Sequence, residues 1–316
     1  MLVSFIRISY AIISYHNQNL CRTTRLISMS VRQKAIAAVC QMTTTVDKTK
    51  NLGIVSELVA EAKQRLATIA FFPEACDYLA DNKKDIVAMA EPLDGPTIQS
   101  YKKLAKDHQI WLSFGGIHEK LPDESEKICN THILINSEGQ VAARYRKVHL
   151  FDMENKEIGV RLMESDYVVK GSEIVSPIAT PIGQLGLSIC YDMRFPELAL
   201  ALRNMGAEIL TYPSAFTYET GAAHWEVLLR SRAIESQCYV IAAAQIGKHN
   251  KKRTSWGHAM IIDPWGSMIA QCSDTIGIAV AEVDLKLLEK IRKNMPCENH
   301  RRIDLYPKVQ ALNTSL

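Results

Sequence analysis

Short apolar runs alternate with segments of helical periodicity, and this alternation most limits how the 316-residue chain can fold. Ala35–Gln41 is an apolar run bounded by polar residues, as expected for a buried strand. Asp47 then offers a helix N-cap, and apolar residues follow it at helical spacing: Val55, Leu58, Val59, Ala62 and Leu66. Similar alternation continues towards the C-terminus, which predicts a protein of the α/β class.

Two pairs of predicted strands are joined by tight turns, so the sheets should be mixed rather than purely parallel. Cys129–Asn136 and Gln140–Tyr145 form one pair, and His258–Ile262 and Ser267–Gln271 form the other. The other predicted strands are Thr68–Phe72, Ile110–Ile117, Leu185–Cys190, Glu208–Thr211, Tyr239–Ala244 and Ile278–Val283. The other predicted helices are Thr97–Asp107, Phe195–Asn204, Ala222–Gln237 and Leu285–Arg292. The sequence has no Pro-, Gly- or Ser-rich linker, which favours one domain over residues 31–310.

Charge and cysteine spacing exclude several classes of function. The formal net charge is only +3, which gives no indication of a nucleic-acid partner. No apolar segment is long enough to suggest a membrane protein. The eight cysteines are scattered without a CxxC pair, which argues against a zinc ribbon or a redox dithiol. We expect reduced cysteines, most of them buried.

The first thirty residues have a composition of their own. They contain Arg7, Arg22 and Arg25 and several serines, and the first acidic residue of the chain is Asp47. Such a start resembles a mitochondrial transit peptide, with translation from Met29 giving a cytoplasmic form. A disordered extension and a secretory signal are the alternatives. We therefore expect residues 1–30 to lie outside the domain and the protein to be mitochondrial and cytoplasmic.

Three short segments place a reactive side chain at the end of a predicted strand, where α/β proteins build their sites. Glu74 follows an apolar run and Pro73, so burial should raise its pKa and suit it to proton transfer, unless it only caps a helix or pairs with a cation. Lys147 should share a strand face with His149, unless both belong to a solvated basic edge.

Cys190 ends the third segment, directly before a predicted helix that begins at Phe195. A helix N-terminus favours the thiolate, and a strand–turn–helix corner can expose a nucleophile. A buried structural cysteine is the alternative.

Together, the three segments resemble the Glu–Lys–Cys set of the nitrilase superfamily of carbon-nitrogen hydrolases. The resemblance extends from about Ala35 to Tyr306, and four long strings are similar to the Nit branch of the family: Cys190–Glu197, Leu210–Phe216, His224–Glu235 and His258–Gly266. It implies a four-layer α–β–β–α sandwich with two mixed sheets. It also implies a homodimer or higher homo-oligomer, and no metal or organic cofactor.

The resemblance further implies an amidohydrolase that cleaves an ω-amide of a small anionic keto acid or peptide. Cys190 would be the nucleophile and Glu74 the proton carrier, with Lys147 and the Tyr191 backbone N–H stabilising the oxyanion. Glu164 corresponds to a second glutamate that lines many pockets of the family. Around the substrate we expect Arg194 as the partner of a carboxylate, together with Tyr212 and Phe216.

Two other hypotheses remain open from the sequence. One is a Cys–His hydrolase that pairs Cys190 with His149, His224 or His258. The other is a binding or scaffolding protein that keeps the fold without catalysis. The complete Glu–Lys–Cys set argues against the second hypothesis.

Overall fold

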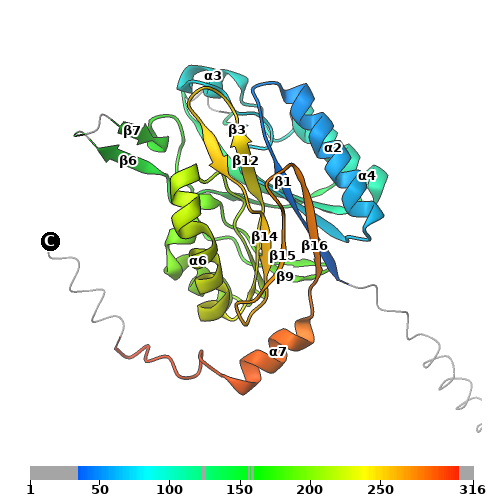
Figure 1. Cartoon of the computed structure of the whole chain (residues 1–316), viewed down its shortest axis with the longest axis vertical. Coiled ribbons are helices and arrows are strands. Elements are labelled where there is room, and N and C mark those ends of the chain that lie inside the picture. Colours follow the sequence, from blue (N-terminus) through cyan, green and yellow to red (C-terminus); the bar gives the residue numbers. More distant parts are fainter. Residues whose placement is uncertain (1–34, 123–125, 156, 158–159, 306–316) are drawn as a thin grey trace, which may run out of the picture. The chain divides into compact units, whose positions relative to one another are not determined.

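The computed structural model describes residues 35–122, 126–155, 157 and 160–305. Within them, two sheets lie face to face between two layers of helices, so the predicted four-layer sandwich is confirmed (Figure 1). The predicted transit segment, residues 1–30, lies outside the described residues, so the localisation stays a prediction.

The first sheet is mixed and has the strand order β13-β12-β1-β2-β3-β4-β5, with β16 also paired to β1. Strands β12, β1, β2 and β3 are parallel to one another, whereas β3, β4 and β5 form an antiparallel meander. The strands of this sheet are β1 (Ile36–Met42), β2 (Ile69–Phe72), β3 (Trp111–Lys120), β4 (Ile128–Ile135), β5 (Val141–Arg146), β12 (Ala244–Lys248), β13 (Thr254–Trp256) and β16 (Gly277–Glu282).

The second sheet has the order β15-β14-β11-β10-β9-β8 and is also mixed. Its strands are β8 (Ile178–Thr180), β9 (Gly183–Gly186), β10 (Ile209–Thr211), β11 (Tyr239–Ala242), β14 (Met260–Ile262) and β15 (Met268–Gln271). A separate two-stranded hairpin, β6 (Asp152–Asn155) and β7 (Val160–Met163), projects from the body of the domain in Figure 1.

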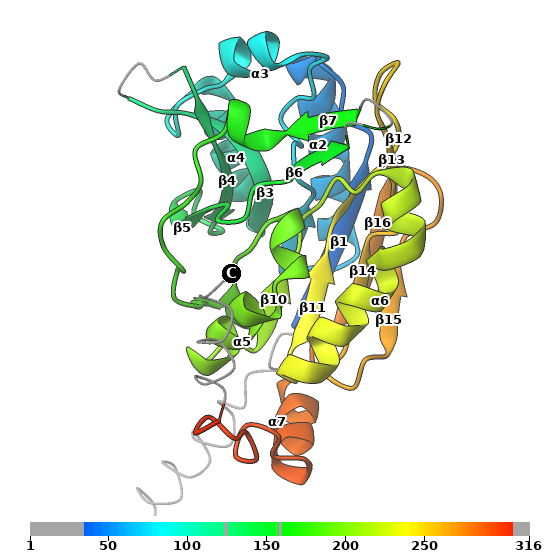
Figure 2. The ribbon, with the colours of Figure 1, turned by 90° about the vertical axis from the view of Figure 1, so that its left-hand side faces the viewer.

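Helices cover the outer face of each sheet, as Figures 1 and 2 show for α2 and α6. Alternate residues of β1 explain the two cores: Ala38 and Cys40 pack under α2 and α4, whereas Ala37 and Val39 face the second sheet. The helices are α2 (Lys48–Gln64), α3 (Lys83–Met89), α4 (Pro96–His108), α5 (Pro196–Asn204), α6 (Tyr218–Ser236) and α7 (Leu285–Asn294). Two 3₁₀ turns, η1 (Glu164–Asp166) and η2 (Cys190–Arg194), complete the elements.

Local sequence signals located the first helix well but misplaced its last residue. The Asp47 side chain accepts hydrogen bonds from the backbone N–H groups of Thr49 and Lys50, as its N-cap position predicts. Leu66 was expected on the buried face, but the helix ends before it. Its backbone is left-handed, with a φ of 63°, and its side chain is 72% exposed.

Two predicted strands are wrong in extent. The segment predicted as Tyr239–Ala244 is two strands, because the chain leaves the second sheet after β11 and enters the first sheet as β12. The strand predicted as Leu185–Cys190 ends at Gly186, and Cys190 instead begins η2. The helix α3, the β6–β7 hairpin and strands β8 and β13 were not predicted.

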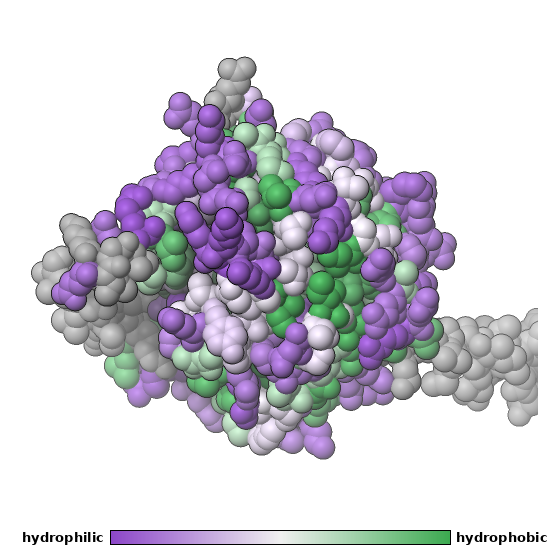
Figure 3. Space-filling model, turned by 45° about the horizontal axis from the view of Figure 1, so that its top comes forward, coloured by the Kyte–Doolittle hydropathy of each residue, from purple (hydrophilic) through white to green (hydrophobic). Residues whose placement is uncertain are grey.

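The described helices, one face of the surface and the cysteines show how apolar side chains are distributed. None of the described helices is long and apolar enough to cross a bilayer. The face in Figure 3 carries short apolar patches among hydrophilic residues. None of the seven cysteines within the described residues forms a disulfide and five of them are buried, which confirms the prediction of reduced, mostly buried cysteines.

Candidate active site

Three segments far apart in the chain bring the Glu, the Lys and the Cys together. Glu74 follows the end of β2, Lys147 follows the end of β5, and Cys190 is the first residue of η2. The Lys147 ammonium donates to Oε1 of Glu74 at 2.9 Å. The Cys190 thiol lies close enough to the Glu74 carboxylate for each group to shift the pKa of the other. The carboxylate therefore lies beside both the ammonium and the thiol.

Glu164 completes a buried charge cluster around the ammonium. Lys147 Nζ donates to Oε2 of Glu164 at 2.9 Å and to Oε1 at 3.1 Å, and Lys147 is only 2% exposed. The Phe151 backbone N–H donates to Oε2 of Glu164 at 2.7 Å. Burial lowers the pKa of Lys147, but Glu164 and Glu74 outweigh it, so the pKa lies well above its ordinary value. The ammonium therefore stays charged despite its burial.

Glu74 is an ionised carboxylate in the resting site. Burial raises its pKa, but the Lys147 charge and the hydrogen bonds from Cys190 and Lys147 bring the pKa down to about 2. The Ala215 backbone N–H also donates to Oε2 of Glu74, at 3.1 Å. The expectation that burial would leave this pKa raised is wrong, because the sequence did not show that a cation lies beside the carboxylate.

Cys190 lies at a strained corner. Its φ is +46°, in the left-handed region that residues other than glycine rarely adopt, and its N–H donates to the Pro213 carbonyl at 2.9 Å. Burial and the Glu74 carboxylate raise the pKa of the thiol, while Lys147 and the Ala215 N–H lower it by less. The expectation of a thiolate favoured by a helix N-terminus is therefore wrong. The resting site holds a protonated thiol beside a carboxylate that can accept its proton.

Asp192 fixes the position of this corner, and sequence reasoning missed it. Its buried carboxylate accepts hydrogen bonds from the Tyr145 hydroxyl at 2.7 Å and the Ile189 N–H at 2.9 Å. It also lies 2.8 Å from Nδ1 of His149. Asp192 thus joins the segment of the nucleophile to the segment that carries Lys147. The predicted shared face of Lys147 and His149 does not form, because β5 ends at Arg146 and the two side chains have different partners.

Arg194 has no carboxylate partner within the described part of the chain. Its guanidinium lies over the rings of Tyr191 and Phe216, at 5.9 and 5.6 Å from their centroids. Its Nη2 lies 3.3 Å from Nδ1 of His224. The guanidinium is therefore held by two aromatic rings and an imidazole rather than by an acidic side chain of the described residues.

Tyr191 and Tyr212 differ in what they can offer a substrate. The Tyr191 backbone N–H donates to none of the described residues, so it is available to a ligand. The Tyr212 side chain is 2% exposed and belongs to the hydrophobic core that includes the second sheet, and burial raises its pKa. The buried position of the Tyr212 side chain therefore gives no support to its predicted contact with substrate.

The histidines of the rival Cys–His hypothesis have other partners. His149 contacts Asp192, His224 contacts Arg194, and His258 lies 3.3 Å from Asp274. Within the described residues, no histidine is hydrogen-bonded to Cys190. The geometry therefore favours Glu74 as the base.

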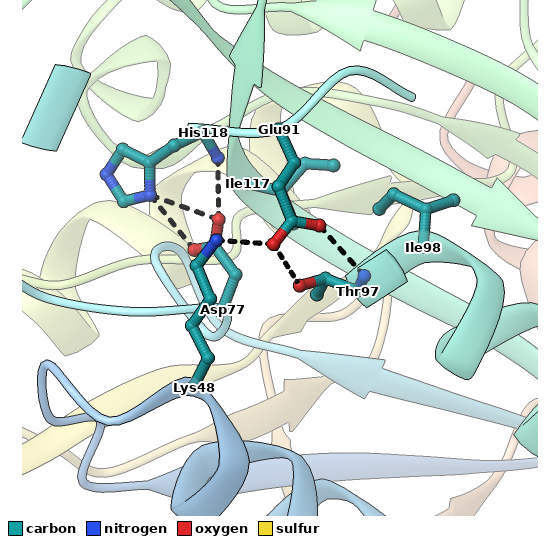
Figure 4. Close-up of a pocket in the computed structure, with 7 residues that line it drawn as sticks. All are labelled: Lys48, Asp77, Glu91, Thr97, Ile98, Ile117 and His118. Carbon is teal, nitrogen blue, oxygen red and sulfur yellow. Dashed lines mark hydrogen bonds and ion pairs between the residues drawn. The ribbon is translucent and has the colours of Figure 1, made fainter. Parts of the chain in front are cut away.

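A second cluster of charges lies at a small pocket near the start of α2 (Figure 4). Lys48 contacts Glu91, and Nδ1 of His118 lies 3.0 Å from Asp77. Glu91 also accepts hydrogen bonds from the N–H and the hydroxyl of Thr97. Because each of these charges has a partner, we interpret the cluster as structural. Among the described residues, no group of three or more His, Cys, Asp or Glu side chains could hold a metal ion.

Comparison with known proteins decides the family. The sequence profile of the family described as carbon-nitrogen hydrolase matches residues 36–293. This chain belongs to the carbon-nitrogen hydrolase family. It is accordingly a hydrolase that acts on carbon-nitrogen bonds other than peptide bonds, with the nitrilase fold that the sequence predicted.

Several relatives of this carbon-nitrogen hydrolase are similar over most of its length. It is 50% identical to the deaminated glutathione amidase of Homo sapiens over 282 residues, which cover 89% of this chain and 86% of the human protein. It is 52% identical to the nitrilase and fragile histidine triad fusion protein of Drosophila melanogaster, of which it spans 59% while 87% of this chain is covered.

Solved structures agree with this assignment. The C. elegans NitFhit protein has a TM-score of 0.83 at 48% identity, covering 87% of this chain and 66% of that one. Saccharomyces cerevisiae Nit3, described as a member of branch 10 of the nitrilase superfamily, has a TM-score of 0.76 at 31% identity, covering 86% of this chain and 97% of that one.

Proposed function

We propose that this carbon-nitrogen hydrolase cleaves an amide of a small anionic keto acid or peptide, deaminated glutathione first among them, through a thioester on Cys190. The observation that carries the proposal is the position of one ionised carboxylate, Glu74, which accepts a hydrogen bond from the Lys147 ammonium and lies beside the Cys190 thiol. This arrangement unites a base, a nucleophile and a fixed positive charge.

The first half of the reaction forms the thioester. Glu74 accepts the thiol proton as the Cys190 sulfur attacks the amide carbon, and the carbonyl oxygen becomes an oxyanion. The Lys147 ammonium and the Tyr191 N–H stabilise that oxyanion where its charge develops. The carbon–nitrogen bond then breaks, and Glu74 returns its proton to the leaving nitrogen, which departs as an amine or ammonia.

The second half returns the enzyme to its resting state. Glu74 or Glu164 takes a proton from water, which attacks the thioester carbon. The carbon–sulfur bond breaks, the acid product leaves, and the sulfur regains its proton. The net reaction consumes one water and one amide and yields one carboxylic acid and one amine or ammonia.

Arg194 supports an anionic substrate. Its guanidinium lies over two aromatic rings and makes no ion pair within the described residues. A planar guanidinium is suited to bidentate binding of a carboxylate. The human relative is named for an amide of this charge, deaminated glutathione. The same observation supports a second candidate function, that of an ω-amidase acting on other keto-acid amides.

A substrate panel tests the proposed function. We expect hydrolysis of deaminated glutathione and of ω-amides of keto acids, with little activity on neutral amides or nitriles of similar size. Product acid would be measured by chromatography, because the leaving group differs between substrates. Hydrolysis of neutral amides alone would contradict the anionic specificity, and no hydrolysis of any amide would contradict the function.

We also propose that the protein forms a homodimer or a higher homo-oligomer. Val227 and Ile234 on α6 and the nearby Trp265 are 66%, 51% and 61% exposed. Such exposed apolar side chains favour association of copies of the chain. Light scattering after size-exclusion chromatography should give at least twice the monomer mass, and a monomer at micromolar concentration would contradict the proposal.

A further inference from the structure

Asn130 lies among the charged residues of the site, although no catalytic role was expected for it from the sequence. It belongs to β4, which lies between β3 and β5 in the first sheet. Its side-chain amide donates to Oε1 of Glu74 at 3.0 Å and to Oε1 of Glu164 at 2.9 Å. Its backbone carbonyl accepts the N–H of Lys147 at 2.9 Å. One residue thus contacts all three members of the buried charge cluster.

The oxygen of the Asn130 side-chain amide shows that the orientation of the amide is set by the two glutamates. Its Oδ1 is buried and has no hydrogen-bond partner among the described residues. A buried acceptor without a partner is rare and calls for an explanation. Rotating the amide by 180° would place Oδ1 against two carboxylate oxygens, which would repel it. The amide is therefore held in the orientation that serves the two glutamates.

We propose that Asn130 is a positioning residue, which holds the carboxylates of Glu74 and Glu164 in place around the Lys147 ammonium. Without it, two negative side chains would compete for one ammonium, and Glu74 could move towards Lys147 and away from the thiol. The neutral amide offers one hydrogen to each carboxylate without adding charge. This inference rests on the proposed function, because it assumes that Glu74 takes the Cys190 proton.

Two variants separate positioning from a purely structural role. Asn130→Ala removes both donors, and Asn130→Asp keeps the size of the side chain but introduces a third carboxylate. Both should lower kcat by about 10²-fold with little change in KM, because a small misplacement of a reacting group costs that much. A donor stabilises the charged form of Glu74, so its loss raises that pKa. The acid limb of the kcat/KM profile should therefore move to higher pH, and further in Asn130→Asp than in Asn130→Ala.

Asn51 offers a matched control. It is a buried asparagine whose amide donates to the backbone carbonyls of Thr45 and Asp77, at 2.8 and 3.0 Å, and has no contact with the site. Asn51→Ala should lower the melting temperature but leave the position of the acid limb unchanged.

A measurement without substrate keeps this inference separate from the proposed function. The rate at which iodoacetamide alkylates Cys190 at neutral pH should rise in both Asn130 variants, because the Glu74 carboxylate, which raises the pKa of the thiol, no longer remains against it. If the wild type hydrolyses no amide, the function fails, and the alkylation rates still test Asn130. Folded Asn130 variants with the wild-type alkylation rate and the wild-type acid limb would overturn the inference. If Asn130→Ala does not fold, the same two readouts on Asn130→Asp decide.

Discussion

The Glu74 carboxylate and the Lys147 ammonium lie 2.9 Å apart although 73 positions separate the two residues in the chain. Glu74 follows β2 and Lys147 follows β5, with β3 and β4 between these strands in the sheet. The contact therefore depends on the residues of β3 and β4 that lie between Glu74 and Lys147. Gly116 of β3 and Asn130 of β4 both adjoin Glu74.

Replacing Lys147 with arginine should be nearly as damaging as replacing it with alanine. The ammonium is enclosed by two carboxylates, and a guanidinium is larger and spreads its charge. We expect a loss of about 10²–10³-fold in kcat, as for the removal of an oxyanion donor. Steady-state kinetics of both variants checks this, and near wild-type activity of Lys147→Arg would contradict the oxyanion role.

Removing the charge of Glu74 and removing the charge of Lys147, each in its own variant, should move the pKa of Cys190 in opposite directions. The Glu74 carboxylate raises the pKa of the thiol, so Glu74→Gln should lower that pKa even though it abolishes turnover. Lys147 lowers the pKa of the thiol, so Lys147→Ala should raise it further. The rate of alkylation of Cys190 as a function of pH reports both shifts. A shift in the same direction in both variants would show that Cys190 does not lie between these charges.

Gly116 should be required for the position of Glu74. Its φ is +68°, and an added Cβ would lie 2.6 Å from Cγ of Glu74 and 2.8 Å from Oδ1 of Asn130. Gly116→Ala should therefore lose stability, by about 1–2 kcal/mol for the backbone conformation alone, and should also lose activity. Gly206→Ala is the matched control, because its φ is +101° and nothing lies within 4 Å of the added Cβ. Thermal unfolding and kinetics should show destabilisation in both variants and an activity loss in Gly116→Ala alone.

The sequence predicted which residues meet in the candidate site better than their electrostatics. Glu74, Lys147 and Cys190 could be found because each lies at the end of a predicted strand and because the three together resemble the set of a known family. The pKa values of Glu74 and Cys190 could not be predicted, since each depends on a residue that only the folded sheet brings near. Asn130 and Asp192 were missed for the same reason: nothing in their neighbours along the chain indicates the carboxylates or donors that they contact. The division of Tyr239–Ala244 between two sheets was likewise invisible, because these six residues form one unbroken run of buried apolar side chains.

Arg194 should distinguish anionic substrates from neutral ones. Arg194→Lys keeps the charge but loses the planar group that lies over Tyr191 and Phe216. We expect KM for an anionic amide to rise by about tenfold or more, and KM for a neutral amide of similar size to change little, since only the anionic substrate loses a bidentate partner for its carboxylate. An equal rise in KM for both substrates would instead show that Arg194 only stabilises the turn at Cys190.

The central claim is that amide hydrolysis proceeds through a thioester on Cys190. The most direct measurement is mass spectrometry of the protein after acid quenching during turnover of deaminated glutathione, with peptide mapping of any added mass. We predict an acyl group on the peptide that contains Cys190 in the wild type. In Cys190→Ala, which should fold normally, we predict neither this acyl group nor turnover. An acyl group on another residue, or turnover that persists in Cys190→Ala, would contradict the account.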